Sequence, residues 1–171
     1  EAEYIKAKSY LAVSRRDEAF LILKTLAGNM SSEYGAEAAY LLIQDSYDKG
    51  DFEDVETKVY AFSDSGTGQT YWLAKSFIVL GDSFADRGEF TQAKATFESV
   101  RDGYTPADDS DDVLDNVRMR LAKLEEMIVE KNLSKEETLA EAIEACKALP
   151  YPEEDMAEVC GELLELKEMG Q

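Results

Sequence analysis

The chain has 171 residues, of which 44% are hydrophobic, and its 37 acidic and 18 basic residues give a formal net charge of −19. This charge repels nucleic-acid phosphates and anionic membrane surfaces, and there is no apolar run long enough for a membrane span, so we expect no nucleic-acid partner and no membrane insertion. The absence of histidine excludes every histidine-dependent triad and, with only two cysteines, zinc sites of the Cys/His type.

The sequence opens inside a helical pattern, without an initiating methionine or a signal peptide, so we expect it to be part of a longer protein. Apolar residues then recur at helical spacing and predict three helix pairs, with no convincing strand pattern. The predicted ranges are 1–13 and 16–27, 33–48 and 51–64, and 69–87 and 89–103. Gly28-Asn29 is expected to cap the end of the first pair.

Similar turns join the helices of the second and third pairs, at Lys49-Gly50-Asp51-Phe52 and Arg87-Gly88-Glu89-Phe90. Glycine ends the first helix of such a pair, the acidic residue caps the second, and the aromatic residue covers the turn. The small residue near the start of each second helix checks the register. These residues are Ala19, Val55 and Ala93, which lie 36 and 38 residues apart.

The third pair carries the clearest motif, Phe77-x-x-Leu80-Gly81-x-x-Phe84 followed by Gly88-Glu89-Phe90-x-x-Ala93-x-x-x-Phe97-x-x-Val100. This arrangement resembles the tetratricopeptide (TPR) repeat, whose ideal period is about 34 residues. The second pair departs from the pattern at Ile43, and the first has Ser14-Arg15-Arg16-Asp17 in place of the turn glycine. The resemblance covers residues 1–104.

The resemblance implies an all-α fold, in which the helix pairs stack into a right-handed α-solenoid. The divergent repeats with an added helix look most like TPR proteins of the bacterial cell envelope, so we favour the periplasm or envelope over the cytoplasm. Trp72 is expected to close the gap between adjacent repeats rather than to act as a binding hot spot.

The composition changes after residue 104, and a helix at 110–131 is expected to pack on the third pair. The acidic run Asp108-Asp109-Ser110-Asp111-Asp112 is interpreted as a helix cap rather than a calcium site. We therefore predict a solenoid domain at 1–131 and a C-terminal helical hairpin at 132–171. The capping box Ser134-Lys135-Glu136-Glu137 would start the hairpin, Leu149-Pro150-Tyr151-Pro152 would turn it, and Gly170 would end it.

The hairpin is either a native cap of the repeats or an engineered extension, and the sequence leaves both open. Its second helix would carry the apolar stripe Met156, Val159, Cys160, Leu163 and Leu166. Cys146 and Cys160 lie on the apolar stripes of facing helices, and buried free thiols are the favoured interpretation. A disulfide requires the loop to shift the register, because a hairpin centred near Pro150 places Cys146 opposite about residue 155.

If the resemblance holds, the first helices line a concave face, and outward positions on that face contact a partner. Three tyrosines with a few polar groups are typical of a peptide or protein groove. The candidate partner-binding residues are Tyr4, Lys8 and Leu11 in the first pair, Glu37, Tyr40, Gln44 and Tyr47 in the second, and Lys75, Ile78, Asp82 and Asp86 in the third.

The sequence therefore predicts a non-enzymatic scaffold that binds a protein or peptide in a concave groove, with no cofactor and no metal. The alternative is a structural spacer, or an engineered repeat scaffold with a grafted hairpin. A hydrolase that uses paired carboxyl groups is the least favoured class, because nothing isolates two of them in an apolar pocket.

Overall fold

The computed structural model describes the backbone of residues 1–148 and 153–169, and the side chains of 1–148 and 160–169. All regular structure in these ranges is helical, which confirms the predicted all-α class. The chain forms two compact units, Glu1–Leu124 and Glu125–Gln171, whereas the sequence predicted a division after residue 131.

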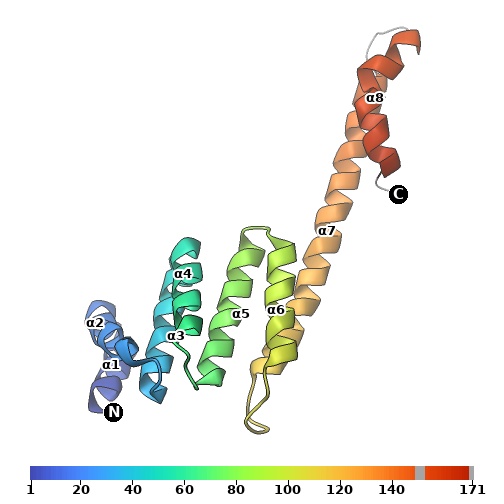
Figure 1. The fold of residues 1–171 in the computed structure, drawn as a ribbon. Coiled ribbons are helices and arrows are strands. Elements are labelled where there is room, and N and C mark those ends of the chain that lie inside the picture. Colours follow the sequence, from blue (N-terminus) through green and yellow to red (C-terminus); the bar gives the residue numbers. More distant parts are fainter. Residues whose placement is uncertain (149–152, 170–171) are drawn as a thin grey trace. The chain divides into compact units, whose positions relative to one another are not determined.

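Six helices of the first unit follow the predicted pairs closely, and Figure 1 shows them side by side in chain order. They are α1 (Ala2–Ala12), α2 (Arg16–Leu26), α3 (Glu33–Asp48), α4 (Phe52–Asp64), α5 (Thr70–Asp86) and α6 (Phe90–Gly103). A 3₁₀ helix, η1 (Ala27–Asn29), continues directly from α2, so Gly28 does not form the cap expected of it.

The three helix pairs turn in the same way. The residue after the cap of each first helix has a positive φ, 60° at Ser14, 71° at Gly50 and 75° at Gly88. Its N–H and that of the next residue donate to carbonyl groups of the last helical turn, which is a Schellman cap. The bonds are Ser14 to Leu11 (3.1 Å) and Arg15 to Tyr10 (2.8 Å), Gly50 to Tyr47 (2.8 Å) and Asp51 to Ser46 (2.9 Å), and Gly88 to Ala85 (2.9 Å) and Glu89 to Phe84 (2.9 Å).

The core of the first unit lies between successive helices. Each pair packs within itself, α2 packs on α3, and both α3 and α4 pack on α5. The small residues used to set the register, Ala19, Val55 and Ala93, are fully buried where second helices meet first helices. Larger side chains such as Phe62 and Phe97 fill the space between them. Every helix therefore depends on its neighbours for burial of its apolar face.

Gly81 allows α5 and α6 to approach closely. A Cβ atom built on Gly81 would lie 2.4 Å from Cε1 of Phe97, whose side chain is buried. The TPR-like motif has glycine here for this reason. The requirement is steric, because Gly81 has ordinary helical backbone geometry.

The sequence predicted that one helix ends at residue 131 and that another starts at Ser134, and this prediction is wrong. A single helix, α7, spans Val113–Lys147, and Ser134 lies in its interior, where its carbonyl accepts a 2.8 Å bond from the Thr138 hydroxyl. The capping box is therefore not used, because the helix continues through a stretch without proline or glycine. The cap at the start of α7 agrees with expectation, since Asp111 accepts a 3.0 Å bond from the Val113 N–H.

The last helix, α8, spans Glu153–Met169. The interpretation of Cys146 and Cys160 as free thiols is wrong, because a disulfide joins them with their Cα atoms 6.1 Å apart. The register argument placed Cys146 opposite about residue 155, whereas the disulfide pairs it with Cys160. The expected turn at 149–152, the helix end at Gly170 and the side chains of Met156 and Val159 lie outside the described residues.

Replacing Ser14 with glycine is expected to stabilise the protein. An L-residue in the left-handed region is strained by about 1–2 kcal/mol, and glycine relieves this strain while losing more entropy on folding, so Ser14→Gly should add about 0.5–1 kcal/mol to the free energy of unfolding. Chemical denaturation measures it. The control Ser9→Gly, in the interior of α1, should instead lower the stability by about 0.5 kcal/mol. A loss at both positions would contradict the turn geometry.

Replacing Gly81 with alanine should destabilise the first unit by about 1–3 kcal/mol, since the new methyl group overpacks the contact with Phe97. Thermal unfolding measures the loss. The second substitution Phe97→Leu should recover part of it by making room. Gly28→Ala is the matched control, because no atom lies within 4 Å of a Cβ built there, and it should leave the stability nearly unchanged.

Candidate interaction surface

The predicted partner-binding residues lie on α1, α3 and α5, and most contact the next helix in the row. The ammonium of Lys8 lies 3.0 Å from Oε1 of Glu37, and the Tyr47 hydroxyl donates a 2.6 Å bond to Asp86. We call this set of contacts the interhelix ladder. It continues toward α7 with Lys75–Asp112 (3.2 Å) and Arg120–Asp82 (2.8 Å to each carboxylate oxygen).

Aromatic rings lie between the same helices. Tyr4 stacks on Tyr34 with ring centroids 4.8 Å apart, which joins α1 to α3. Tyr40 lies 5.4 Å from Trp72 and joins α3 to α5. Trp72 therefore lies between adjacent helix pairs, as expected. All four rings are partly exposed, so each offers apolar surface and solvent contact at once.

The predicted partner-binding residues differ in how much of each residue is exposed to solvent. Asp86 and Lys8 are exposed, while Leu11, Gln44 and the tyrosines are partly exposed, and Gln44 donates a 3.0 Å bond to Asp48 of its own helix. Ile78 is only 4% exposed and belongs to the core, so its assignment to a partner-contacting face is wrong. Ile78 occupies the same position in its helix pair as Tyr4 and Tyr40 occupy in theirs, but the Ile78 side chain is buried.

Burial and neighbouring groups shift the pKa values of three residues of the ladder. Burial and the neighbouring Asp86 carboxylate raise the pKa of Tyr47, so its hydroxyl remains a donor. Burial lowers the pKa of Lys75, but hydrogen bonds to Asp112 and Tyr71 outweigh this effect and raise it overall. Burial raises the pKa of Asp82 despite the opposing charge of Arg120. Within the ladder the Tyr47 hydroxyl donates to Asp86, and the Asp82 carboxylate accepts from Arg120.

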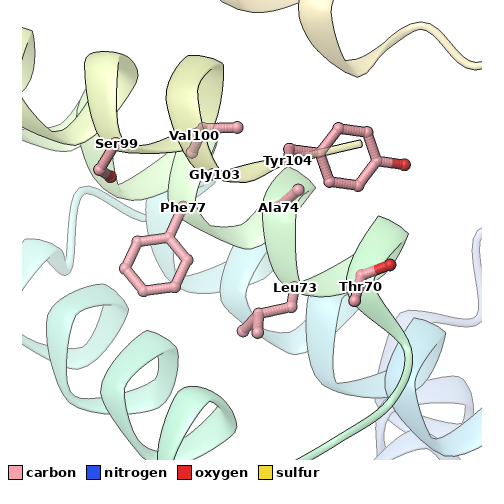
Figure 2. Close-up of a pocket in the computed structure, with 8 residues that line it drawn as sticks. All are labelled: Thr70, Leu73, Ala74, Phe77, Ser99, Val100, Gly103 and Tyr104. Carbon is pink, nitrogen blue, oxygen red and sulfur yellow. The ribbon is translucent and has the colours of Figure 1, made fainter. Parts of the chain in front are cut away.

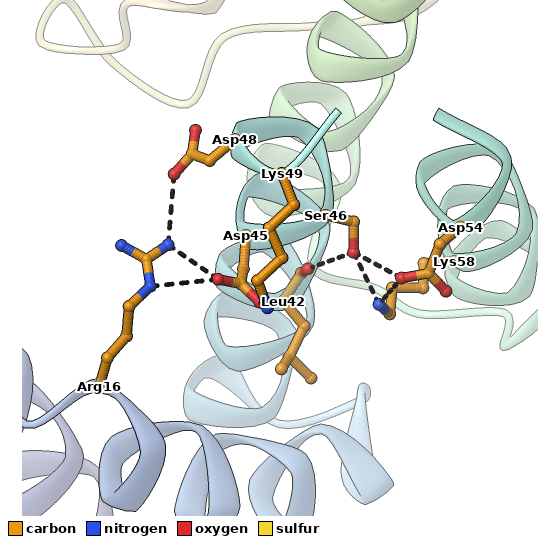
Figure 3. A network of polar contacts seen from close by, with 8 residues as sticks. All are labelled: Arg16, Leu42, Asp45, Ser46, Asp48, Lys49, Asp54 and Lys58. Carbon is orange, nitrogen blue, oxygen red and sulfur yellow. Dashed lines mark hydrogen bonds and ion pairs between the residues drawn. The ribbon is translucent and has the colours of Figure 1, made fainter. Parts of the chain in front are cut away.

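A second polar network, which the sequence analysis missed, joins α2, α3 and α4 (Figure 3). Arg16 donates to Asp45 at 2.8 Å, and Lys49 donates to the same carboxylate at 2.6 Å. Burial opposes the ionisation of Asp45, but the hydrogen bonds from Lys49 and Arg16 prevail and lower its pKa. An aspartate within the apolar stripe of α3 was the available signal, because buried carboxylates need partners.

On the other side of α3, the Ser46 hydroxyl lies 2.7 Å from the Lys58 ammonium and 2.6 Å from Asp54 (Figure 3). A serine beside a lysine is one arrangement for nucleophilic catalysis. Here Ser46 is 3% exposed and also contacts the Leu42 carbonyl oxygen at 3.0 Å. Asp54 forms an ion pair with Lys58, and the hydrogen bonds from Lys58 and Ser46 lower the pKa of the Asp54 carboxyl. The group therefore fastens α3 to α4 and offers no accessible nucleophile.

A pocket of about 240 Å³ opens between α5 and α6 (Figure 2). Its walls are mostly apolar, with hydroxyl groups from both helices and from the residue after α6. It includes none of the predicted partner-binding residues. The lining residues are Thr70, Leu73, Ala74, Phe77, Ser99, Val100, Gly103 and Tyr104.

Comparison of the chain with protein-family models, with curated proteins and with solved structures finds no match. Within the described residues, no group of three or more acidic or cysteine side chains is arranged to hold a metal ion. No helix in that part of the chain is long and apolar enough to cross a membrane.

Asp45→Asn should lower the free energy of unfolding by about 1–3 kcal/mol at neutral pH, because it leaves two cations without their shared carboxylate. The pKa of Asp45 is lower in the folded chain, so its contribution is present above the unfolded value of about 3.9 and fades as the pH falls through the folded value. The two proteins should therefore converge below about pH 4 in urea titrations. A constant gap from pH 7 to pH 3 would count against this account.

Asp48→Asn is the matched control. Asp48 lies three residues after Asp45 on the same helix and also pairs with Arg16, but its carboxylate is 48% exposed and 3.4 Å from the guanidinium. Exposed pairs contribute about 0–1 kcal/mol, so this change should be nearly silent at every pH.

Proposed function

We propose that residues 1–124 form a short TPR-like right-handed solenoid that binds a protein or peptide segment along its first helices, without catalysing a reaction. The observation that carries the proposal is the interhelix ladder. It connects α1, α3 and α5 in chain order through side chains of one predicted face. Aligned helices of this kind offer a continuous surface that crosses several repeats.

The chemistry of this face suits recognition. Tyr4, Tyr40 and Tyr47 are each partly exposed, and tyrosine combines a large contact area with a hydrogen-bonding hydroxyl and few rotamers to fix. Gln44 and Asp86 add polar groups between or beside the rings. The net charge of −19 favours association with neutral or cationic partners.

A structural spacer is the second candidate, and a specific observation favours it. Several polar groups of this face already bond to neighbouring parts of the chain. They belong to Lys8, Tyr47, Lys75 and Asp82. A face whose polar groups are all paired internally would stiffen the array and leave little for a partner. The two functions therefore differ in whether the partly exposed rings and Gln44 touch another chain.

Site-specific photo-crosslinking separates these candidates. Benzoylphenylalanine replaces Gln44 on the proposed face in one protein and Tyr60 in another, and each is expressed in the native host. Tyr60 is 46% exposed on α4 and is the control for random encounter. We expect a discrete adduct from position 44 and none from position 60. Equal labelling, or none at either position, would favour the spacer.

Once an adduct is identified, Tyr47→Phe combined with Gln44→Ala should weaken binding of that partner by about 1 kcal/mol or more, about fivefold in affinity. Both changes are compatible with a helix, and phenylalanine keeps the aromatic ring at position 47. Calorimetric titration measures the affinity, and circular dichroism checks that the fold is retained. Unchanged affinity would remove these residues from the interface.

A further inference from the structure

The disulfide occupies a central place in the second unit, Glu125–Gln171. Cys146 lies in the last turn of α7, which ends at Lys147, and Cys160 lies near the middle of α8. Their side chains are shielded, with residue exposures of 8% for Cys146 and 2% for Cys160. The bond therefore fixes α8 against α7 inside the small core of the hairpin.

Little apolar burial accompanies this bond. Among the described side chains of residues 125–169, only Ile143 is buried along with the two cysteines. Leu164, Leu166 and Met169 of α8 are exposed by 40%, 51% and 78%. A unit that spans only residues 125–171 is of a size at which a covalent or metal staple is usually needed to maintain the fold.

Electrostatics also opposes closure of the hairpin. Residues 125–171 carry 14 acidic and 4 basic side chains. Like charges on neighbouring helices repel, most strongly at low salt. The polar contacts of Thr138 and Lys147 run along α7, to Ser134 and Glu144, and do not reach across to α8.

We propose that the Cys146–Cys160 disulfide is the element that keeps α8 folded against α7, so that the hairpin is closed in the oxidised chain and open in the reduced chain. The inference is independent of the proposed function of residues 1–124. Such bonds persist in oxidising compartments, and the hairpin is accordingly suited to one.

The redox step is a two-electron exchange with a dithiol. A thiolate of the dithiol attacks one cysteine sulfur and forms a mixed disulfide, while the other cysteine leaves as a thiolate and is protonated. The second thiol of the reagent then displaces the first cysteine and closes a cyclic disulfide. The chain gains two electrons and two protons, which the dithiol loses. Because both sulfurs are shielded, we expect reduction to wait for transient opening of the hairpin.

Hydrogen exchange of the full chain, with and without dithiothreitol, tests the proposal. In the oxidised protein, the amides of 153–169 should be protected. After reduction they should exchange about tenfold faster or more, while those of α3 and α5 change by less than about twofold. Unchanged protection of 153–169 in the reduced chain would show that packing alone holds the helix and would overturn the proposal.

The double variant Cys146→Ala and Cys160→Ala separates the bond from the reagent. It should exchange like the reduced chain from the start and respond to dithiothreitol with no further change. Labelling of the untreated wild type with a maleimide, after unfolding in urea to expose both sulfurs, should modify neither cysteine. Two reactive thiols in protein purified under oxidising conditions would overturn the proposal at its first step.

Discussion

The arrangement of the first unit depends on the turn that reverses the chain within each helix pair. A Schellman cap with one residue at positive φ returns the second helix along the first and delivers the chain to the start of the next pair. Three such turns, at Ser14, Gly50 and Gly88, are separated by 36 and 38 residues. Since the reversal is the same each time, α1, α3 and α5 fall into one row, and the interhelix ladder connects them. Without the shared turn, neither the packing nor the candidate surface would exist.

The ladder joins neighbouring helices, and the recognition that we propose would use the same residues. Exposed ion pairs contribute about 0–1 kcal/mol each, because water solvates their charges well in either arrangement. Arg120–Asp82 has two hydrogen bonds of 2.8 Å, whereas Lys8–Glu37 has one of 3.0 Å, so Arg120–Asp82 is the more durable contact. The contact between neighbouring helices is therefore stronger at α5 than at α1.

The sequence predicted what local patterns control. Helix bounds in residues 1–104 follow from apolar spacing and from turn glycines, and Ser14 shows that the same turn forms without glycine. The sequence did not predict side-chain contacts between different helices. Asp45 interrupts the apolar stripe of α3, but neither it nor Ser46 indicates in the sequence which residue of α2 or α4 is its partner. Ile78 was misassigned because a helical position specifies a direction, while burial depends on what another helix places there.

The C-terminal errors have separate physical origins. A capping box at 134–137 stabilises a helix start, but its free-energy contribution is about 1 kcal/mol, and uninterrupted helix formers on both sides favour continuation. The error at the cysteines concerned register instead, because the sequence does not specify which positions of the two helices face each other, and the disulfide pairs Cys146 with Cys160. The two units are thus held by different means. The first is stabilised by repeated noncovalent packing, which tolerates the loss of a single contact, whereas the second concentrates its stability in one covalent bond.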